Sequence, residues 1–441
     1  MSPQTSIFHR SLSKAYPPAT GGKGVYLHTA DGRRVLDGCS GAAVSCLGHG
    51  HAEVIEAIVA QAQTMAYAHT AFFTSTAAER LADLLLDQSH GAFAKVMFLS
   101  SGAEAVESAI KIARQFHLSR AEDARVNVIG RVSSYHGNTL GALAAGFHPD
   151  RRAPYEPMLS KTFHHVSPCF YSRDGGHGAN EAEYEDRLLE EFREKIQELG
   201  PHTVAAIIVE PVVGMSLGCV PATRNYLPRL KSLCEEFGIL LIFDEVMCGM
   251  GRVGTFHAWQ SLGGVAPHLQ ANAKGLGGGY QPISAVLVSE EVHAEILKAS
   301  ETSPFVHGQT YQGHSIGCAA ALATQTVIKR DGLLENVVKR GQLLVSSIRN
   351  GLPKEVEIEI RGLGLFQAVS FGKTGAEYSG GALAEDVSGE CFKRGVAVLV
   401  CSSVVDAFMV APPFIISEAE VLELANTIVV SIDAVLRRRR L

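Results

Sequence analysis

The chain alternates short, wholly apolar runs with longer segments in which apolar residues recur at helical spacing. The short runs, typical of buried strands, lie at 96–99, 126–130, 205–209, 239–243, 269–273 and 284–288. The amphipathic segments, typical of helices, lie at 52–67, 77–86, 103–116, 181–199 and 225–237. Strands that are apolar throughout and alternate with helices are typical of a largely parallel sheet covered on both faces. The pattern therefore predicts an α/β fold.

The two ends of the chain differ from this middle part. Residues 21–38 hold short β-type runs around an Asp31-Gly32 turn, which predicts a hairpin. After about residue 328 the pattern mixes helical and β-like segments, at 332–350, 356–360, 365–370, 396–400 and 417–436. The stretch 151–180 reads as mostly loop.

A chain of 441 residues is too long for one simple core, so we expect a large domain and a smaller one. We place the large domain at 51–328 and an α+β domain at 329–441, which the N-terminal segment 1–50 joins. With 46% hydrophobic and 19% charged residues, the composition is that of a globular enzyme rather than a disordered chain.

Charge and cysteine content restrict the partners and the compartment. The formal net charge of −6 gives no broad basic field, so nucleic acid is not expected as a partner. Nine cysteines without a CxxC pair indicate reduced, buried thiols and a cytoplasmic protein. No apolar run approaches the roughly 20 residues of a membrane helix. The histidines lack the spacing and companions of a metal site, so no metal is expected.

Ligands of open α/β sheets bind at the C-terminal ends of the parallel strands, so residues that follow strands deserve chemical scrutiny. The run 96–99 leads into Ser101-Gly102-Ala103 at the start of a helix, where free backbone N–H groups favour a phosphate. Taken alone, Ser101 is more typical of a plain helix cap, with Glu104 completing a capping box, because caps outnumber phosphate sites.

Two charged residues follow other strands. Asp244 ends the run 239–243, where a buried carboxylate needs a partner such as a protonated pyridine nitrogen; a surface loop is the alternative. Lys274 stands between an apolar strand and a glycine cluster, as suits an amine that must be partly desolvated and closely approached. A lysine taken at random is usually a solvated surface charge. Lys274 is a candidate for a chemical role only because Asp244 and Ser101 follow other strands of the same predicted sheet.

The order of longer segments now resembles one known family, the class III (ω-type) aminotransferases among the fold type I pyridoxal phosphate (PLP) enzymes. The matching segments span most of the chain: SSGAEAVESAIKIAR (100–114), YHGNTLGAL (135–143), VEPVVG (209–214), LLIFDEVMCGMGRVG (240–254), ANAKGLGGGYQPISAV (271–286), GQTYQGH (308–314), RGLGLF (361–366) and APPFIIS (411–417). The resemblance implies a large domain with a mostly parallel seven-stranded sheet flanked by helices, and a smaller α+β domain built from both termini.

The resemblance also implies roles around the cofactor ring. Lys274 resembles the lysine that forms the Schiff base with PLP and shuttles the proton, and Asp244 resembles the partner of the pyridine nitrogen. Tyr135 is similar to the aromatic residue that stacks on the ring, and Val246 to the residue on the opposite face. His136 is expected near the cofactor, held by packing rather than acting as a base.

Further positions match the family's phosphate and substrate sides. Ser101, Gly102 and Ala103 resemble the phosphate cup, and Glu210 resembles a glutamate of the substrate side. Thr310 resembles the threonine that reaches the phosphate from the partner subunit, which implies a homodimer with shared active sites.

The implied reaction is a ping-pong transfer of an amino group from a primary amine or amino acid to a keto acid. Epimerases, aminomutases and lyases on the same scaffold stay open as alternatives. A nicotinamide-dependent oxidoreductase is a remote alternative, because Gly249–Gly254 satisfies GxGxxG but lacks the acidic residue about 20 positions on.

One segment departs from the family. Many relatives that act on ornithine, acetylornithine or 4-aminobutyrate carry a carboxylate-binding arginine just before the APP-like proline, where this chain has Ala407–Val410. Replacing a bidentate guanidinium by apolar side chains favours an apolar amine or a bulkier amino acid as the donor. Arg361 could bind a carboxylate or serve a structural role.

Overall fold

The computed structural model describes residues 5–175, 180–353, 356–372 and 382–439. Its centre is a seven-stranded sheet with the strand order β4-β12-β11-β10-β7-β5-β6. Only β12 runs against its neighbours, and the other adjacent pairs are parallel. The predicted mostly parallel seven-stranded sheet is therefore confirmed. Its strands are β4 (Lys95–Leu99), β5 (Asn127–Arg131), β6 (Phe163–Val166), β7 (Val204–Val209), β10 (Leu240–Asp244), β11 (Leu269–Asn272) and β12 (Ser284–Val288).

One of these strands was not predicted. The edge strand β6 lies inside the stretch that reads as loop, and it pairs with β5 in parallel. Its sequence, Phe-His-His-Val, lacks the continuous apolar run of the central strands because an edge strand is only partly buried. The loop prediction for this segment is wrong.

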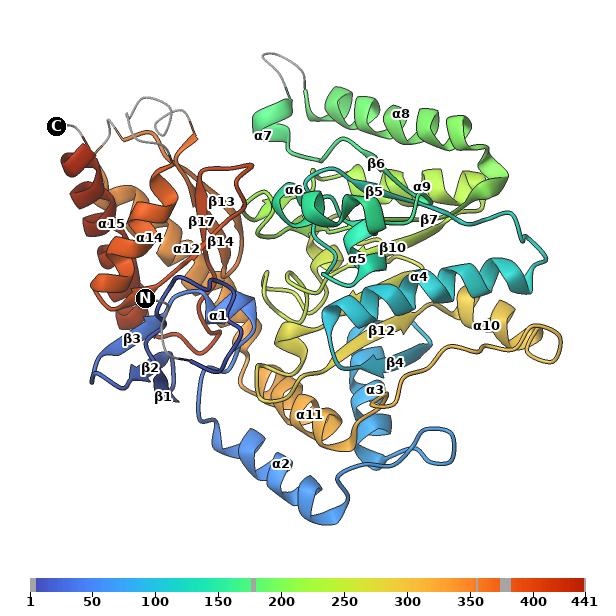
Figure 1. The fold of residues 1–441 in the computed structure, drawn as a ribbon, viewed down its shortest axis with the longest axis horizontal. Helices are drawn as coiled ribbons and strands as arrows, with labels where there is room; N and C mark the ends of the chain where they lie inside the picture. Colours follow the sequence, from blue (N-terminus) through green and yellow to red (C-terminus); the bar gives the residue numbers. More distant parts are fainter. Residues whose placement is uncertain (1–4, 176–179, 354–355, 373–381, 440–441) are drawn as a thin grey trace.

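Helices cover both faces of the sheet (Figure 1). The helices are α1 (Ser40–Ala43), α2 (Ala52–Thr64), α3 (Thr76–Gln88), α4 (Gly102–Ser119), α5 (Leu140–Ala145), α6 (Pro149–Arg152), α7 (Tyr171–Asp174), α8 (Glu181–Leu199), α9 (Tyr226–Phe237), α10 (Glu290–Lys298), α11 (Ser315–Arg330), α12 (Leu333–Gly351), α14 (Leu383–Lys393) and α15 (Glu418–Arg439). Helix α4 packs on one face, and α8 and α9 contribute to the core on the other.

The central strands are apolar throughout because alternate side chains enter two different cores. In β10, Leu240 and Ile242 join the core under α4, whereas Leu241 and Phe243 join the core that includes α8 and α9. Side chains of a strand point alternately to opposite faces, so both sets are buried. This double burial fixes the register of β10 and hence the position of the residues that follow it.

The two ends of the chain meet in smaller sheets on the left of Figure 1. The N-terminal strands turn at Asp31-Gly32 as predicted, and β3 pairs in parallel with β15 from the C-terminal part. The remaining strands are β1 (Ala19–Lys23), β2 (Tyr26–Thr29), β3 (Arg34–Asp37), β8 (Val212–Val213), β9 (Val220–Pro221), β13 (Glu359–Leu363), β14 (Phe366–Ser370), β15 (Val396–Ala397), β16 (Leu399–Val400) and β17 (Ala407–Val410). The domain boundaries near residues 50 and 328 stay predictions.

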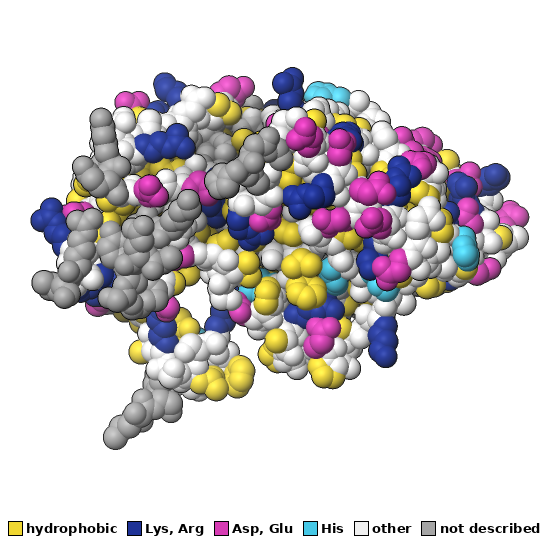
Figure 2. Space-filling model, turned by 90° about the horizontal axis from the view of Figure 1, so that it is seen from above, with side chains coloured by type: hydrophobic (Ala, Val, Ile, Leu, Met, Phe, Trp, Pro, Cys, Tyr) yellow, Lys and Arg dark blue, Asp and Glu magenta, His cyan; other side chains and the backbone are white. Residues whose placement is uncertain are grey.

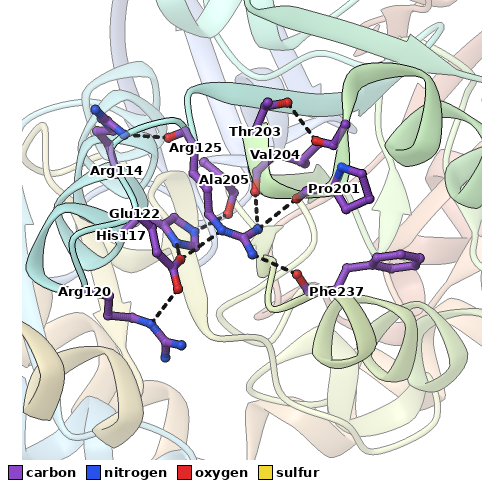
Figure 3. Close-up of polar contacts among 11 residues, drawn as sticks. Arg114, His117, Arg120, Glu122, Arg125, Pro201, Thr203, Val204, Ala205 and Phe237 are labelled. Atoms are coloured by element: carbon purple, nitrogen blue, oxygen red, sulfur yellow. Dashed lines mark hydrogen bonds and ion pairs between the residues drawn. The ribbon is translucent and has the colours of Figure 1, made fainter.

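A polar cluster fastens the N-terminal ends of three central strands (Figure 3). We call it the Arg125 cluster: Arg114, His117, Arg120, Glu122, Arg125 and the backbone carbonyls that they contact. Arg125 donates to the carbonyls of Val204 at 2.7 Å and Phe237 at 3.0 Å, and its Nε lies 2.9 Å from Glu122. These bonds connect the start of β5 to the start of β7 and to the end of α9.

The described surface carries charges of both signs. Figure 2 shows Lys and Arg side chains mixed with Asp and Glu over the described part of the face above α8 and α9. None of the described helices has both the length and the apolar character needed to cross a membrane. Within the described ranges, no group of three or more His, Cys, Asp or Glu side chains is placed to hold a metal ion.

Candidate active site

A cavity of about 460 Å³ opens at the C-terminal ends of the central strands. Its volume lies within the roughly 300–1,000 Å³ range of small-molecule sites. All but one of the residues predicted to form the site line it: Ser101, Gly102, Ala103, Tyr135, His136, Glu210, Asp244, Val246 and Lys274. They come from the ends of β4, β5, β7, β10 and β11, which the parallel sheet brings to one edge.

Lys274 stands two residues after the buried end of β11, at the start of a short 3-10 helix. Its backbone adopts a positive φ of 45°, a left-handed conformation that costs a non-glycine residue about 1–2 kcal/mol. The half-buried side chain reaches the cavity, and its amine has no hydrogen-bond partner among the described residues. Burial lowers the pKa of the amine, and the carboxylates of Asp244 and Glu210 oppose this shift. A neutral amine is therefore more accessible here than on the surface.

Asp244 is buried at the end of β10, with 4% of its surface exposed. Its Oδ1 accepts a hydrogen bond from the Val246 amide at 3.0 Å, and its Oδ2 lies 2.7 Å from Nδ1 of His136. The surface-loop alternative for Asp244 is wrong. The buried His136 is fixed by this contact, and its Nε2 has no partner among the described residues.

Glu210 holds the backbone of the predicted stacking residue. Its Oε1 accepts from the Tyr135 amide at 3.0 Å and its Oε2 from the Gly214 amide at 3.1 Å. Burial raises the pKa of Glu210, and repulsion from Asp244 adds to this effect. Glu210 thus positions Tyr135, whose half-buried ring forms one wall of the cavity.

The turn before α4 is both a helix cap and an array of free donors. The Ser101 Oγ accepts from the Glu104 amide at 3.3 Å, as a capping residue does, and Glu104 accepts from the Ser100 amide at 2.8 Å. The amides of Gly102 and Ala103 keep no partner among the described residues, and the Ser101 hydroxyl can still donate. The capping and phosphate interpretations are therefore compatible.

Gly102 is required by close packing against the cavity wall. A Cβ at Gly102 would lie 2.8 Å from Cγ1 of Val246, closer than side-chain carbon atoms approach. Val246 is half-buried and lines the cavity beside this turn. Gly102, which follows Ser101, and Val246, two residues after Asp244, are thus packed against each other in the cavity wall.

Thr310 is the predicted site residue that the chain does not bring to the cavity. It is exposed, and its carbonyl accepts a hydrogen bond from the Tyr67 hydroxyl at 2.7 Å. Its role in the active site of a partner subunit stays a prediction.

Two features considered for substrate recognition, Arg361 and the segment Ala407–Val410, have structural roles. Arg361 donates to the carbonyls of Leu217 and Gly218, both at 2.8 Å, and pairs with Glu359 at 2.6 Å, so its guanidinium is fully engaged. The side chains of Ala407–Val410 form the buried strand β17 and alternate between two cores. The expectation that they offer an apolar surface to the substrate is wrong, because strand burial and not exposure explains their apolar character.

Sequence reasoning did not single out several residues of the cavity wall. They are Val44, Ser100, Gly137, Asn138, Met247, Ala273, Gly279, Gln281, Pro282 and Ile283. Some carried a usable signal, since Gly137 and Asn138 directly follow His136, and Gly279–Ile283 ends the glycine-rich segment after Lys274. Val44 carried none, because it reaches the cavity from the N-terminal part of the chain only through tertiary structure.

The glycine-rich Gly249–Gly254 segment does not form a dinucleotide site. It consists of turns and leads to a short 3-10 helix at Ala258–Ser261 rather than directly into an α-helix. A dinucleotide fingerprint requires the helix N-terminus immediately after the glycines, to face the pyrophosphate. The geometry therefore removes the support for a nicotinamide-dependent oxidoreductase.

Comparisons with known proteins agree with this geometry. The family model "Aminotransferase class-III" matches residues 9–432. An uncharacterised aminotransferase of Schizosaccharomyces pombe is 38% identical over 96% of this chain and 94% of its own length. Diaminobutyrate–2-oxoglutarate transaminase of Halomonas elongata is 33% identical over 92% of this chain and 87% of its own.

The fold is similar to that of solved transaminases. The ω-transaminase of Pseudomonas jessenii in complex with PMP superposes with a TM-score of 0.93 at 27% identity, covering 99% of this chain and 98% of that chain. The comparisons give no support for an epimerase, an aminomutase or a lyase. This chain therefore belongs to the class III aminotransferases, enzymes that transfer amino groups with PLP as their cofactor.

Proposed function

We propose that this enzyme moves an amino group from a primary amine or amino acid to a keto acid in two half-reactions at the cavity, with Lys274 as the catalytic residue. The observation that carries the proposal is the placement of the Lys274 amine in the same cavity as the buried carboxylate of Asp244. An amine and a carboxylate that are buried at strand ends without a direct ion pair are costly, and such a cost is typical of a site that holds a ligand.

The described residues fit PLP. The free amides of Gly102 and Ala103 and the Ser101 hydroxyl suit its phosphate, and the helix dipole of α4 favours an anion at this end. Tyr135 and Val246 suit the two faces of its ring.

The remaining polar groups suit the pyridine edge of the ring. Asp244 offers a carboxylate to the ring nitrogen, and the His136 contact at 2.7 Å keeps this carboxylate oriented. When bound, PLP supplies an aldehyde that accepts the amino group and a ring that withdraws electrons from the substrate carbon.

Lys274 is the group in this cavity that can take and return a proton at the substrate carbon. Its lowered pKa increases the neutral fraction of the amine, and only a neutral amine accepts a proton. Glu210 acts through the backbone of Tyr135 and does not itself need to transfer a proton. These roles support transfer in both directions, as two half-reactions require.

We also propose that the enzyme is a homodimer in which Thr310 contributes to the partner's site. Thr310 lies in the same loop as Val306, which is 86% exposed, and its carbonyl accepts from Tyr67 in the loop that holds Phe72, which is 80% exposed. The Tyr67 and Tyr311 rings pack 5.8 Å apart and connect these loops. Exposed apolar clusters of this kind mark protein interfaces.

A cytoplasmic location is proposed on the state of the thiols. All nine cysteines are buried and free of disulfide bonds. Unpaired cysteines persist where the environment is reducing.

The test begins with loading the protein with PLP and reducing it with borohydride. Peptide mapping is expected to find a covalently attached pyridoxyl group on Lys274, and none in a Lys274→Ala variant. Incubation with an amine donor and no acceptor is then expected to give stoichiometric pyridoxamine phosphate. Label on another lysine would disprove the assignment, and absence of pyridoxamine phosphate with every donor would indicate another reaction.

A further inference from the structure

Arg151 is an unpaired guanidinium beside the cavity. It belongs to the short helix α6, and its guanidinium carbon lies 5.1 Å from the centre of the Tyr135 ring. Among the residues that the structure describes, its guanidinium has no hydrogen bond and no carboxylate within ion-pair distance. The side chain is half-buried and lies against Tyr135, a residue of the cavity wall, although Arg151 does not itself line the cavity.

Both neighbours of Arg151 are engaged, and they hold α6 in place. Arg152 is buried and donates to the carbonyls of Ala144 at 3.0 Å and Gly146 at 2.9 Å. Asp150 accepts from the Ser403 hydroxyl at 2.6 Å, and this bond, more than the nearby charges of His148 and Arg151, lowers the pKa of its carboxyl. The helix is thus anchored on two sides, with Arg151 between the anchors against Tyr135.

A keto acid needs a cation at this site that the cavity wall does not supply. Among the described residues lining the cavity, Lys274 is the only lysine or arginine, and the reaction itself requires it. Arg361 is engaged with backbone carbonyls and Glu359. A substrate carboxylate that enters a site with the buried acids Asp244 and Glu210 requires a compensating charge.

We propose that Arg151 binds the carboxylate of the keto acid or amino acid substrate at the edge of the Tyr135 ring; the proposal rests on the aminotransferase function above. A guanidinium that stacks on an aromatic face keeps its N–H groups in its own plane, where they can donate to a carboxylate in bidentate geometry. Arg151 therefore determines acceptance of carboxylate-bearing substrates, whereas uncharged amines react without it.

The experiment compares holoenzyme variants in single half-reactions. Arg151→Met keeps a long side chain over the Tyr135 ring but removes the charge. Arg151→Lys keeps the charge but removes the planar guanidinium that can bind a carboxylate in bidentate geometry. Arg80→Met, an exposed arginine on α3, is the matched control. The probes are pyruvate with only a 2-carboxylate, succinic semialdehyde with only a distal carboxylate, and butanal with none.

Arg151→Met is expected to raise the KM for one or both carboxylate probes roughly 10- to 100-fold, the usual effect of losing a charge-assisted bond. The KM for butanal and the rate with an uncharged monoamine are expected to stay within about twofold. Arg151→Lys should restore part of the loss, and Arg80→Met should resemble wild type. Whether pyruvate or succinic semialdehyde is the more affected probe identifies which carboxylate is bound.

A direct binding measurement completes the test. Calorimetric titration of the holoenzyme with butyrate, an unreactive carboxylate, is expected to show binding that weakens about tenfold or more in Arg151→Met. Equal losses for butanal and pyruvate would overturn the proposal and assign Arg151 to positioning Tyr135. Unchanged kinetics in Arg151→Met would also overturn it. Failure of the wild-type enzyme with every amine would instead refute the proposed function.

Discussion

The two ends of the central sheet both carry polar clusters, but the hydrogen-bonding groups are paired at one end and partly unpaired at the other. At the N-terminal ends, the Arg125 cluster pairs its donors with oxygens: both ring nitrogens of His117 lie within 2.9 Å of an oxygen, from Ala205 and Glu122 (Figure 3). At the C-terminal ends, the Nε2 of His136 is buried without a partner among the described residues. The amine of Lys274, which lines the cavity, also makes no hydrogen bond or ion pair with a described residue.

The difference separates stability from function within one sheet. Buried polar groups that are paired add to stability or are neutral, whereas unpaired groups are costly. The unpaired groups at the C-terminal edge line a cavity in which a ligand could supply the missing partners, so we expect this edge to carry the chemistry. Substitutions in the Arg125 cluster should therefore affect folding, and substitutions in the cavity should affect catalysis.

The largest expected effect comes from Lys274→Met. Removing the amine deletes the group that we propose transfers the proton, and amino transfer should fall by about 10³-fold or more. The variant should remain folded, because the amine makes no hydrogen bond with a described residue. Half-reaction rates with the PLP-loaded enzyme and circular dichroism measure the two parts. A variant with more than a tenth of wild-type activity would remove Lys274 from catalysis.

Arg125→Met tests the opposite end of the sheet. It leaves the carbonyls of Val204 and Phe237 without their donor and Glu122 without its closest cation, so stability should fall by about 2–4 kcal/mol. The kcat should change less than twofold, since the cluster lies at the other end of the strands. Urea unfolding and steady-state assays are the measurements. A large loss of kcat in protein that is still folded would contradict the separation.

The sequence predicted the cavity end of the sheet better than the rest because most of the site residues that it singled out follow a buried strand. Asp244 and Lys274 were placed correctly since the apolar runs before them fix where β10 and β11 end. The position of the Ser101 turn was also predicted, because Ser101 has the sequence pattern of a cap at the start of a long amphipathic helix.

The failures share a physical cause, which is dependence on distant parts of the chain. The apolar segment Ala407–Val410 looks the same in a sequence whether it faces a substrate or two cores. Arg151 comes from a four-residue helix without a motif, and its contact with Tyr135 spans a connection that no local pattern encodes. Thr310 is not one of these failures, because its role in a partner subunit stays a proposal.

The pH dependence of stability should show the cost of the unpaired amine directly. Burial lowers the pKa of Lys274 in the folded enzyme, so between this lowered pKa and 10.5 the unfolded chain binds a proton that the folded chain does not. Stability contributed by this residue therefore rises as the pH rises through that window. PLP-free Lys274→Met should be more stable than wild type near pH 7, by about 1 kcal/mol, and the difference should shrink toward pH 10. A constant or growing difference would contradict the assigned shift.

The smallest effect is expected for Arg120→Ala, and it sharpens the account of the Arg125 cluster. Arg120 contacts Glu122 at 3.1 Å, but its side chain is 43% exposed, so water and salt screen the pair. The loss should stay within about 0.5 kcal/mol and vanish in high salt. Arg125 contacts the same carboxylate with a side chain that is only 12% exposed, so its larger effect should persist in salt. Equal, salt-sensitive losses for both variants would mean that charge, rather than buried hydrogen bonds to the strand ends, holds this edge of the sheet.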